Sequence, residues 1–556
     1  MTPLPVKIAY IPLLYQSDDL RATISTGHKM MICLWKLAAI LMLNFAACEA
    51  AKILLIAPGS PSHLQQVYVI GKQLVKSGRH EITVLVPKHI ENSPILTNDK
   101  INVLTYKASP AAERMDTDDD IQKEWQKTAL EGNLWAMLRN LREFNYEACT
   151  SFLKDQELFA KVKAKNFDFA IIDGISFCRC MYFMAYRLNI PYATVVTVLA
   201  PDMMSSVLNL PSIREPLTVN AVIGDDEGTF VWRVKNALKS VMFVLVESFT
   251  INQNQFAYLV PERPPTTVEK LARDSKIWLI DSDSSLDAPQ PIMPHVFQVG
   301  GLSISKPKQL ESKFKAIADK ATDSLVLISF GGNVKAMDDE YYNKIYEALK
   351  KLPQFTFIWK IKQHPKENPP KNVHIFDWIP QREILAHKNV VLFITHCGNA
   401  GQYEALYSAV PMLGIPFFGD QHSNAIRMFR RGFGQFLDLK TFTTPMLTDM
   451  IVEMTLNPRY KRAIRKASAL YWLKEPAIER AAKAIEHVLE HGSDHLRSPA
   501  VELEWYQLLM WDVALFLLIV TLVVIFIIGF CLSKCYKCCR RYCCRSGKQK
   551  RKQKQR

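Results

Sequence analysis

The sequence lacks several of the features that would settle its class at once. No Asn-x-Ser/Thr glycosylation sequon occurs in its 556 residues, so glycosylation gives no help on topology. Cysteine is scarce in the body of the chain: between residue 51 and the long apolar run near the C-terminus only Cys149, Cys178, Cys180 and Cys397 occur. This scarcity excludes a small fold built on many disulfides, because such scaffolds are dense in cysteine.

Acidic residues are absent from the tail. Between residues 534 and 556 there are eleven Lys or Arg and no Asp or Glu. The tail therefore supplies most of the formal net charge of +15, and the rest of the chain is close to neutral. A basic folded body would be needed for a nucleic-acid-binding role, so we expect no nucleic-acid partner. The length and the hydrophobic content of 49% favour two folded domains plus membrane segments.

The uncharged run at Val513–Leu532 is long enough to cross a bilayer as a helix. Four basic residues follow within nine positions, and the positive-inside rule then places the tail in the cytosol. A buried core helix does not fit a run of this length and uniform hydrophobicity. We therefore expect a single-pass type I membrane protein with a juxtamembrane segment at 493–512, the membrane helix at 513–532 and a cytosolic tail at 533–556.

The N-terminal region contains a second apolar run, at residues 30–50 (MMICLWKLAAILMLNFAACEA). A lysine precedes the run and small residues end it, which is typical of a cleaved signal peptide. Residues 1–29 match no pattern and are interpreted as an upstream extension from an earlier start codon. The signal peptide would place the bulk of the chain in the lumen of the endoplasmic reticulum.

The tail carries two further signals. Lys552 and Lys554 are the fifth and third residues from the C-terminus, the spacing of a cytosolic retrieval signal for membrane proteins of the endoplasmic reticulum; a generic basic tail is the alternative. Five cysteines follow the membrane helix, and palmitoylation beside the bilayer is favoured over zinc binding: Cys535, Cys538, Cys539, Cys543 and Cys544. Membrane lipid is thus an expected partner.

Alternating strand and helix patterns divide the body into two halves. The first half begins with an apolar strand at 53–57, a Pro-Gly-Ser-Pro loop, a helix up to Lys76 and a strand at 82–86. This is the first unit of a parallel α/β sheet, and the strand pattern recurs at 167–173 and 191–197. We place the first domain at 51–295.

The second half restarts after a linker rich in Pro and Gly at 289–301. Strands are predicted at 324–330, 355–361, 390–394 and 411–415, with helices between them. We place this domain at 296–492, including a helix at 476–491 that packs back toward the first domain. The pattern indicates α/β architecture with two doubly wound, Rossmann-like domains.

The most informative segment spans residues 376–434: FDWIPQREILAHKNVVLFITHCGNAGQYEALYSAVPMLGIPFFGDQHSNAIRMFRRGFG. Trp378 offers an indole face for stacking, and Gln381 an amide for hydrogen bonds. Thr395 and His396 end a buried strand, and the turn at Gly398–Gly401 opens a helix whose backbone N–H groups and dipole favour phosphate oxygens. A core tryptophan and a structural histidine are the alternatives.

Two acidic positions complete this segment. Glu404, placed in the first turn of the same helix, can accept hydrogen bonds from both hydroxyls of a ribose; the alternative is an ordinary acid near a helix N-terminus. Asp420 and Gln421 come after a second apolar strand and before a helix at 422–433. The set is that of a nucleotide-sugar site.

In residue types and spacing this segment resembles the signature of the eukaryotic UDP-glycosyltransferases, the family that includes the UDP-glucuronosyltransferases. The chain is similar to an invertebrate-like member. The resemblance extends from Lys52 to the tail. It implies two Rossmann-like domains facing a cleft, the glycosyltransferase B-type fold, with the acceptor site in the first domain and the UDP-sugar site in the second. It also implies that Asp420 and Gln421 hold the hydroxyls of the transferred sugar.

Further donor positions follow from the resemblance. Gly331 and Gly332 resemble the loop that approaches the phosphates, with Gly332 in place of a serine, and Lys360 stands where the family has a basic residue near them. Cys397 replaces a small Gly or Ala, which we interpret as a mild change because cysteine is also small. Asp281 stands where glucuronate-using vertebrate members carry Arg, so a carboxylate facing the donor would disfavour UDP-glucuronate and favour UDP-glucose.

The expected catalytic pair lies in the first half. His63 follows the loop after the first strand, and Asp173 ends a later strand of the same sheet, so both lie at the edge where parallel sheets bind ligands. We expect His63 to act as general base and Asp173 to orient it; a loop histidine without a role is the alternative. A helix N-terminus and nearby cations offset the leaving-group charge, so we expect no metal and no cofactor beyond the UDP-sugar co-substrate.

The acceptor is expected to be a small lipophilic molecule, bound by the Phe-, Met- and Trp-rich stretch between residues 90 and 254. The predicted activity is the inverting transfer of a glucuronosyl or glucosyl group to it. A UDP-glucose-specific enzyme and a catalytically inactive lipophile-binding relative are the alternatives. Homo-oligomer formation is left open.

Overall fold

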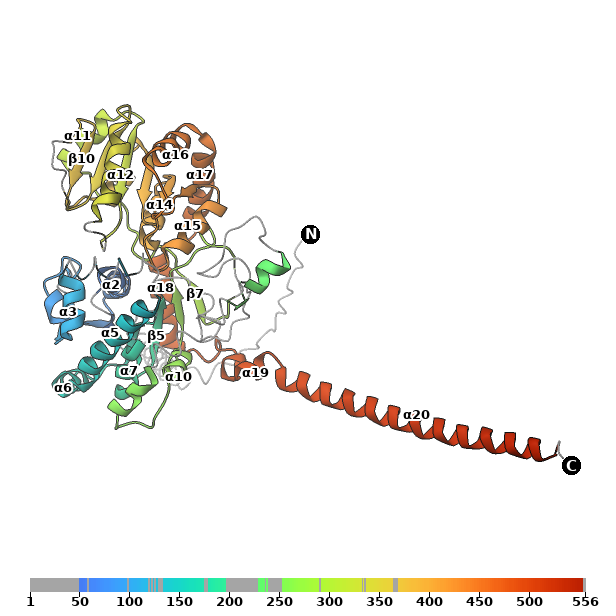
Figure 1. Cartoon of the computed structure of the whole chain (residues 1–556). Coiled ribbons are helices and arrows are strands. Elements are labelled where there is room, and N and C mark those ends of the chain that lie inside the picture. Colours follow the sequence, from blue (N-terminus) through green and yellow to red (C-terminus); the bar gives the residue numbers. More distant parts are fainter. Residues whose placement is uncertain are drawn as a thin grey trace, which may run out of the picture. The chain divides into compact units, whose positions relative to one another are not determined.

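The structure is a computed structural model of the whole chain (Figure 1). It describes residues 50–553 apart from fourteen gaps: 58–59, 98–99, 119–120, 122–123, 125–126, 129–133, 175–178, 197–228, 236, 239–252, 290–291, 333, 335–336 and 364–368. The predicted upstream extension, nearly all of the predicted signal peptide, and part of the retrieval signal lie outside the described residues.

The first half forms a seven-stranded sheet in the order β3-β2-β1-β4-β5-β6-β7, with every pair parallel. The strands are β1 (Lys52–Ile56), β2 (Glu81–Pro87), β3 (Ile101–Tyr106), β4 (Phe169–Asp173), β5 (Tyr192–Val196), β6 (Trp278–Ile280) and β7 (Val296–Gln298). The central strands are continuous apolar runs because helices cover both faces of the sheet.

Alternate residues of β1 point into different cores. Leu54 and Ile56 pack on one face with the helices α5, α6, α7 and α10, whereas Ile53 and Leu55 pack on the other face with α2. The bounds of these elements are α2 (Pro61–Lys76), η1 (Lys88–Ile90), α3 (Pro110–Thr117), α5 (Leu134–Lys154), α6 (Gln156–Ala164), η2 (Arg179–Met181), α7 (Tyr182–Leu188), η3 (Gln253–Leu259) and α10 (Val268–Arg273).

The second half forms a six-stranded parallel sheet in the order β10-β9-β8-β11-β12-β13. Its strands are β8 (Leu325–Ser329), β9 (Thr356–Lys360), β10 (Val373–Phe376), β11 (Val390–Thr395), β12 (Met412–Gly414) and β13 (Gly434–Phe436). Its helices are α11 (Ser312–Lys320), α12 (Asp339–Lys350), α13 (Gln381–Leu385), α14 (Asn399–Tyr407), α15 (Gln421–Arg430), α16 (Thr444–Leu456) and α17 (Pro458–Trp472). α12 and α16 cover one face, and α11, α14, α15 and α17 cover the other.

The boundary between the two halves differs slightly from the prediction. β7 pairs with β6 and is therefore the last strand of the first sheet, so the predicted start of the second domain at 296 falls inside the first one. The sequence hid this strand because it is only three residues long and follows a proline-rich stretch. The chain leaves the first sheet only after Gln298.

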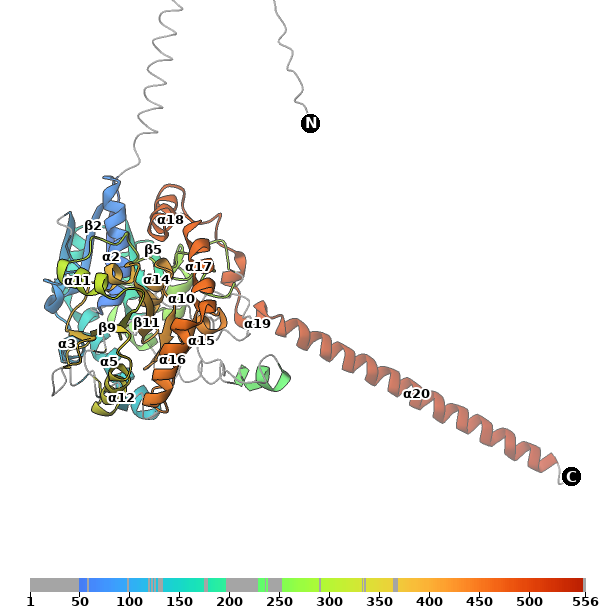
Figure 2. The same cartoon turned by 90° about the horizontal axis from the view of Figure 1, so that it is seen from above.

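The predicted return of the chain to the first half is confirmed. α18 (Ala477–His491) packs against α2, and Figures 1 and 2 both draw it beside that helix. Its buried residues, among them Ala481 and Ile485, belong to the same core as Ile53 and Leu55 of β1. A short η4 (Pro499–Glu502) and α19 (Trp505–Leu508) follow.

The last element, α20 (Trp511–Gln553), is one continuous helix of 43 residues. Within the described part of the chain it is the one helix long and apolar enough to cross a membrane, with a candidate span at Trp511–Tyr542. At 1.5 Å per residue it is about 65 Å long, roughly twice the hydrocarbon thickness of a bilayer. The helix therefore continues beyond the predicted span into the basic tail.

Candidate active site

The topology brings four predicted site residues to two equivalent places. In each sheet the strand order reverses between two neighbouring strands, β1 and β4 in the first and β8 and β11 in the second. Loops diverge at such a switch point and leave room for ligands at the carboxyl ends of the strands. His63 follows β1 and Asp173 ends β4, while Gly331 follows β8 and His396 follows β11.

His63 and Asp173 form a close pair. The imidazole Nδ1 lies 2.6 Å from the Asp173 Oδ2, and the side chains are 22% and 0% exposed. An ionised carboxylate accepts hydrogen bonds only, so Nδ1 carries the proton and the other ring nitrogen, Nε2, is left as the basic atom. The pair therefore has the geometry of an oriented general base.

The electrostatics of His63 involve both sheets. Burial alone would lower the pKa of His63, but the charge and hydrogen bond of Asp173 raise it above its ordinary value, and the carboxylate of Asp420 adds to this rise. Asp420 belongs to the second half, where it directly precedes α15. The imidazole and the Asp420 carboxylate thus interact although they come from different halves of the chain.

Asp420 and Gln421 are held by hydrogen bonds to residues close to them in the sequence. Asp420 Oδ2 accepts a hydrogen bond from the Asn424 Nδ2 at 2.5 Å, and burial raises the pKa of the Asp420 carboxyl. Gln421 is the first residue of α15 rather than part of the preceding loop. Its Oε1 accepts from the backbone N–H groups of Phe417 and Phe418, so its amide NH₂ is the group that can face a ligand.

His396 is wedged between two glycines. A Cβ placed on Gly331 would lie 2.6 Å from the His396 Nε2, and one placed on Gly398 would lie 2.5 Å from the same atom. Burial, with the charge of Lys360, lowers the pKa of His396 to about 4, so the ring is neutral at physiological pH. Its Nδ1 is buried and has no hydrogen-bond partner within the described residues.

Trp378 and Lys360 stand next to this turn. The indole is 73% exposed, and the Lys360 Nζ lies 4.7 Å from its ring centroid while donating to the Gly331 carbonyl at 3.1 Å. Burial lowers the pKa of Lys360, and the Glu404 carboxylate partly opposes this. For Gly332, by contrast, the described residues other than its chain neighbours place no heavy atom within 4 Å of the position that a Cβ would take.

Gln381 and Glu404 are joined side chain to side chain. Gln381 Nε2 donates to the Glu404 Oε2 at 2.5 Å, and burial raises the pKa of Glu404. Glu404 is the sixth residue of α14 and therefore lies in its second turn, not in the first as predicted. The hydrogen bond fixes the carboxylate in one orientation, as recognition of a pair of hydroxyls requires.

Two positions of the predicted donor set, Thr395 and Gly401, and the neighbouring Cys397 lie within or beside the turn before α14. Thr395 is fully buried, and its Oγ1 accepts from the Cys397 N–H, so it shapes the turn and does not reach the surface. Gly401 is buried inside α14, with ordinary contacts around it. Cys397 has a φ of 67°, a left-handed conformation that favours glycine, so the change from Gly is more than a matter of size.

A comparison of the sequence with known families gives a match over residues 51–547 to the family described as "UDP-glucoronosyl and UDP-glucosyl transferase". The chain belongs to the UDP-glycosyltransferase family. Among curated relatives, this UDP-glycosyltransferase is 30% identical to UDP-glucuronosyltransferase 2A3 of Homo sapiens over 493 residues, which are 86% of this chain and 92% of that protein. It is 29% identical to UDP-glucuronosyltransferase 1A1 of Mus musculus over 513 residues, 89% and 94% of the two chains.

Solved structures agree on the fold. A UDP-glucose:anthocyanidin 3-O-glucosyltransferase in complex with UDP aligns with a TM-score of 0.56 at 16% identity, covering 80% of this chain and 99% of that one. Phytolacca americana UGT2, complexed with UDP-2fluoro-glucose and pterostilbene, aligns with a TM-score of 0.54 at 16% identity, with the same coverage. The UDP-glycosyltransferase thus has the glycosyltransferase B-type fold.

In this UDP-glycosyltransferase, Asp281 lies elsewhere than the sequence suggested. A carboxylate facing the donor would disfavour UDP-glucuronate, but Asp281 is 1% exposed and its oxygens accept hydrogen bonds from protein groups. Its Oδ1 accepts from the Gly301 N–H at 2.6 Å, and its Oδ2 accepts from Gln66 at 2.6 Å and from Asn399 at 2.9 Å. Burial raises the pKa of Asp281 to about 7, partly opposed by the backbone bonds.

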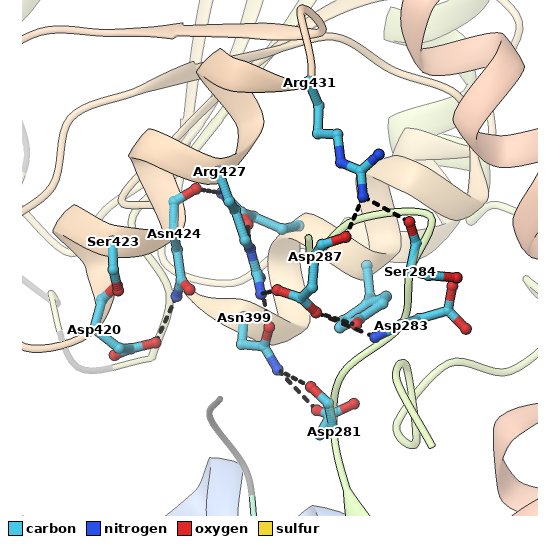
Figure 3. Close-up of polar contacts among 12 residues, drawn as sticks. Asp281, Asp283, Ser284, Asp287, Asn399, Asp420, Ser423, Asn424, Arg427 and Arg431 are labelled. Carbon is cyan, nitrogen blue, oxygen red and sulfur yellow. Dashed lines mark hydrogen bonds and ion pairs between the residues drawn. The ribbon is translucent and has the colours of Figure 1, made fainter. Parts of the chain in front are cut away.

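Asn399 and Arg427, which no sequence motif indicated, complete a polar cluster between the sheets (Figure 3). Arg427 Nη2 donates to the Asn399 Oδ1 at 2.5 Å, and its Nη1 donates to the Asp287 Oδ1 at 2.6 Å. Asp287 lies in the loop after β6, whereas Asn399 and Arg427 belong to α14 and α15. The side-chain roles of these residues could not be predicted from the sequence, because they depend on how the two halves pack together.

Asp281 and Asp283 also have the Asp-x-Asp spacing that can mark a metal site. Asp283, however, accepts from the Lys474 Nζ at 2.7 Å and from the Ser285 N–H at 2.8 Å, and Asp281 is engaged as described above. Within the described ranges, no three His, Cys, Asp or Glu side chains are grouped so as to hold a metal ion. Both carboxylates are structural in this arrangement.

Proposed function

We propose that this UDP-glycosyltransferase moves a glucuronosyl or glucosyl group from a UDP-sugar to a hydroxyl of a small lipophilic acceptor, with inversion at the anomeric carbon. The observation that carries the proposal is the 2.6 Å contact between His63 and the buried Asp173, electrostatically linked to Asp420 of the other sheet. In this proposal His63, from the first half, acts as a base beside Asp420, in the sugar-binding segment of the second half.

The reaction is a single displacement. His63 Nε2 takes the proton of the acceptor hydroxyl as the oxygen forms its bond to the anomeric carbon. The bond from that carbon to the β-phosphate oxygen breaks, and its electron pair leaves with UDP. Asp173 keeps the imidazole in the required tautomer and stabilises the imidazolium that forms. One displacement from the opposite side inverts the configuration.

The leaving diphosphate is received by the second switch point. The first N–H groups of α14 and the loop at Gly331 and Gly332 provide donors, and Lys360 provides a positive charge. His396 is neutral, so it serves the phosphate as a hydrogen-bond donor and not as a cation. Its buried Nδ1 without a partner supports a role in which one ring nitrogen meets a ligand or an ordered water.

The nucleoside and the sugar are assigned to the remaining positions. The exposed Trp378 ring stacks on uracil, and the joined side chains of Gln381 and Glu404 bind the base edge and the ribose hydroxyls. Asp420 and the NH₂ group of Gln421 bind the hydroxyls of the transferred hexose. Thr395, Gly398 and Gly401 shape the turn that these contacts require.

A UDP-glucose-specific enzyme is the second candidate. It was first suggested by the carboxylate at position 281, but Asp281 is buried and its oxygens are engaged by protein donors. What favours a neutral hexose is instead the Asp420 carboxylate near His63, which would repel a sugar carboxylate placed there. A catalytically inactive lipophile-binding relative has no need of an oriented His63–Asp173 pair.

The cellular setting follows from the sequence signals. We propose an endoplasmic-reticulum protein with α20 as its membrane helix, the two sheets in the lumen and the basic tail in the cytosol. The acceptor would then reach the first half from the lipid phase. Protease treatment of sealed microsomes tests the orientation: an epitope at the C-terminus should be removed while the body stays protected.

The function is tested by mass spectrometry of the products from microsomes given UDP-glucose and UDP-glucuronate with a panel of phenols and sterols. His63→Ala should lower kcat by about 10²–10⁴-fold, the usual contribution of a general base, while leaving the Kd for UDP unchanged. Full activity in His63→Ala would remove the assigned base. A panel that yields no conjugate with either donor would favour the inactive relative.

A further inference from the structure

We propose that Gln66, Asp281, Asn399 and Arg427 form a buried relay of hydrogen bonds that positions the N-terminus of α14 against the helix that carries His63. These four residues are called the interlobe relay below. The inference rests on the proposed function, because it concerns the alignment of the donor phosphates with the catalytic base. None of the four side chains is assigned a contact with substrate; only the backbone N–H of Asn399, as the first residue of α14, belongs to the phosphate site.

The relay begins on α2, the helix that carries His63. Gln66 lies three residues after His63 on α2, so both side chains are on the same side of that helix. Gln66 is 3% exposed and donates from Nε2 to the Asp281 Oδ2 at 2.6 Å. Asp281 follows β6 and is itself fixed by the Gly301 N–H. These bonds join α2 to the loop that follows β6.

The relay continues into α14, the helix whose N-terminus is assigned to the phosphates. Asn399 is the first residue of α14, and it donates from Nδ2 to the Asp281 Oδ2 at 2.9 Å. Its Oδ1 accepts from the Arg427 guanidinium, which also bonds the Gln402 Oε1 at 2.7 Å and the Asp287 Oδ1 at 2.6 Å. Figure 3 shows Arg427 between Asn399 and Asp287. One guanidinium thus holds α14 at two points and the first half at a third.

Burial gives the relay its precision. Asp281, Asn399 and the Arg427 side chain are 1%, 8% and 10% exposed. Buried polar groups that lose a partner cost about 1–3 kcal/mol each, and more when charged, so alternative arrangements of the two helices are disfavoured. Exposed contacts between the halves, such as that of Arg431 with the Ser284 carbonyl at 2.7 Å, do not reach α14.

The consequence for catalysis is specific. In the proposed function UDP contacts groups of the second half only, so loss of the relay should leave nucleotide affinity in place. Transfer, however, requires the anomeric carbon within reach of an acceptor held by His63, and a misplacement of about 1 Å costs roughly 10²-fold in rate. The relay residues are therefore positioning residues, and their loss should appear in kcat.

The principal test compares Asn399→Ala with Arg431→Ala in the full-length enzyme. Asn399 donates to the Asp281 carbonyl and Arg431 donates to the Asp287 carbonyl, so both bond the loop after β6. Of the two, only Asn399 joins that loop to the start of α14. We expect Asn399→Ala to lower kcat at least tenfold, with the Kd for UDP changed less than threefold, and Arg431→Ala to leave kcat within twofold. UDP affinity is measured by calorimetry and folding by thermal unfolding.

A reciprocal exchange provides the second test. Asp281→Asn alone turns an NH₂ group toward the Asn399 NH₂, and Asn399→Asp alone places two carboxyl groups together. In the double variant Asp281→Asn/Asn399→Asp, the new carboxylate accepts from position 281 and from Arg427. Gln66 can flip its amide to match, since its Oε1 has no partner among the described side chains. We expect the double variant to recover at least half of the kcat lost by the worse single variant.

The outcomes separate the relay from simpler roles. If Asn399→Ala lowers the melting temperature but leaves kcat unchanged, the cluster has only a structural role. If Asn399→Ala and Arg431→Ala lower kcat equally, the relay is one interlobe contact among several. A UDP Kd weakened more than tenfold would make Asn399 a donor contact. A double variant no better than the single ones refutes the pairing. Failure of the proposed function is recognised separately, by a fully active His63→Ala.

Discussion

A single methyl group on Gly331 should disrupt the phosphate site. Gly331 has a φ of 81°, in the left-handed region that L-residues avoid, and an added Cβ would lie 2.6 Å from the His396 Nε2. The imidazole has little room to move, because Gly398 is also so close that a Cβ there would lie 2.5 Å from the same nitrogen. Gly331→Ala therefore strains the backbone and displaces His396 together.

The size of the effect follows from these two costs. A left-handed conformation costs an L-residue about 1–2 kcal/mol. Overpacking of a tightly fitted site adds typically about 1–3 kcal/mol. The sum of about 2–5 kcal/mol corresponds to a fall in melting temperature of roughly 5–15 °C for a domain of this size. Because His396 is moved, the affinity for UDP should fall at least tenfold.

The neighbouring glycine supplies the control. Apart from its chain neighbours, no described residue places a heavy atom within 4 Å of an added Cβ on Gly332, and its φ is outside the left-handed region. Gly332→Ala should therefore change the melting temperature by less than about 2 °C, as for a surface substitution. Thermal unfolding of the detergent-solubilised enzyme and calorimetric titration with UDP measure both quantities for the two variants.

Removal of the His396 ring tests whether the steric conflict with the new Cβ causes the loss of stability. In Gly331→Ala/His396→Ala the steric conflict is gone, so part of the lost melting temperature should return while UDP affinity stays low. If Gly331→Ala binds UDP as tightly as the wild type, or if it and Gly332→Ala lose equal stability, the fit of His396 between the glycines does not govern the site.

Two further predictions concern the first half. The base form of His63 is required, and its pKa is raised, so kcat/KM should fall as pH decreases through a value above 6.5; Asp173→Asn should shift this limb to lower pH and also reduce the rate, as seen in pH–rate profiles. Cys149 and Cys180 form a disulfide across a separation of 31 residues, which contributes about 3–4 kcal/mol by loop-closure entropy. Cys149→Ser/Cys180→Ser should therefore melt several degrees lower than the wild type, whereas Cys397→Ser, which breaks no disulfide, gives the comparison for loss of a thiol.

Much of the architecture was predictable because its signals are local. Apolar runs such as that of β1 identify buried parallel strands, and the loops after them identify the edge where ligands bind. The same reasoning led to His63 and Asp173, whose side chains prove to be in contact. Their catalytic role remains a prediction.

What the sequence could not provide depends on packing between distant segments. Asp281 and Asn399 are 118 residues apart, and only the assembled sheets turn the carboxylate into an internal acceptor and not a donor-facing charge. The positive φ of Cys397 was likewise invisible, because residue size says nothing about backbone conformation. The disulfide was missed since several pairings of the body's cysteines were compatible with the sequence alone.

The return of α18 to the first sheet has a consequence for biosynthesis. The apolar side of α2 is covered by residues such as Ala481 and Ile485, which are made about 180 residues after the last strand of that sheet. At translation rates of about 5–20 residues per second, roughly 10–40 s pass before the cover is available. During that interval the apolar side of α2 is exposed on the nascent chain, so we expect chaperones to bind it and a fragment ending after β7 to aggregate.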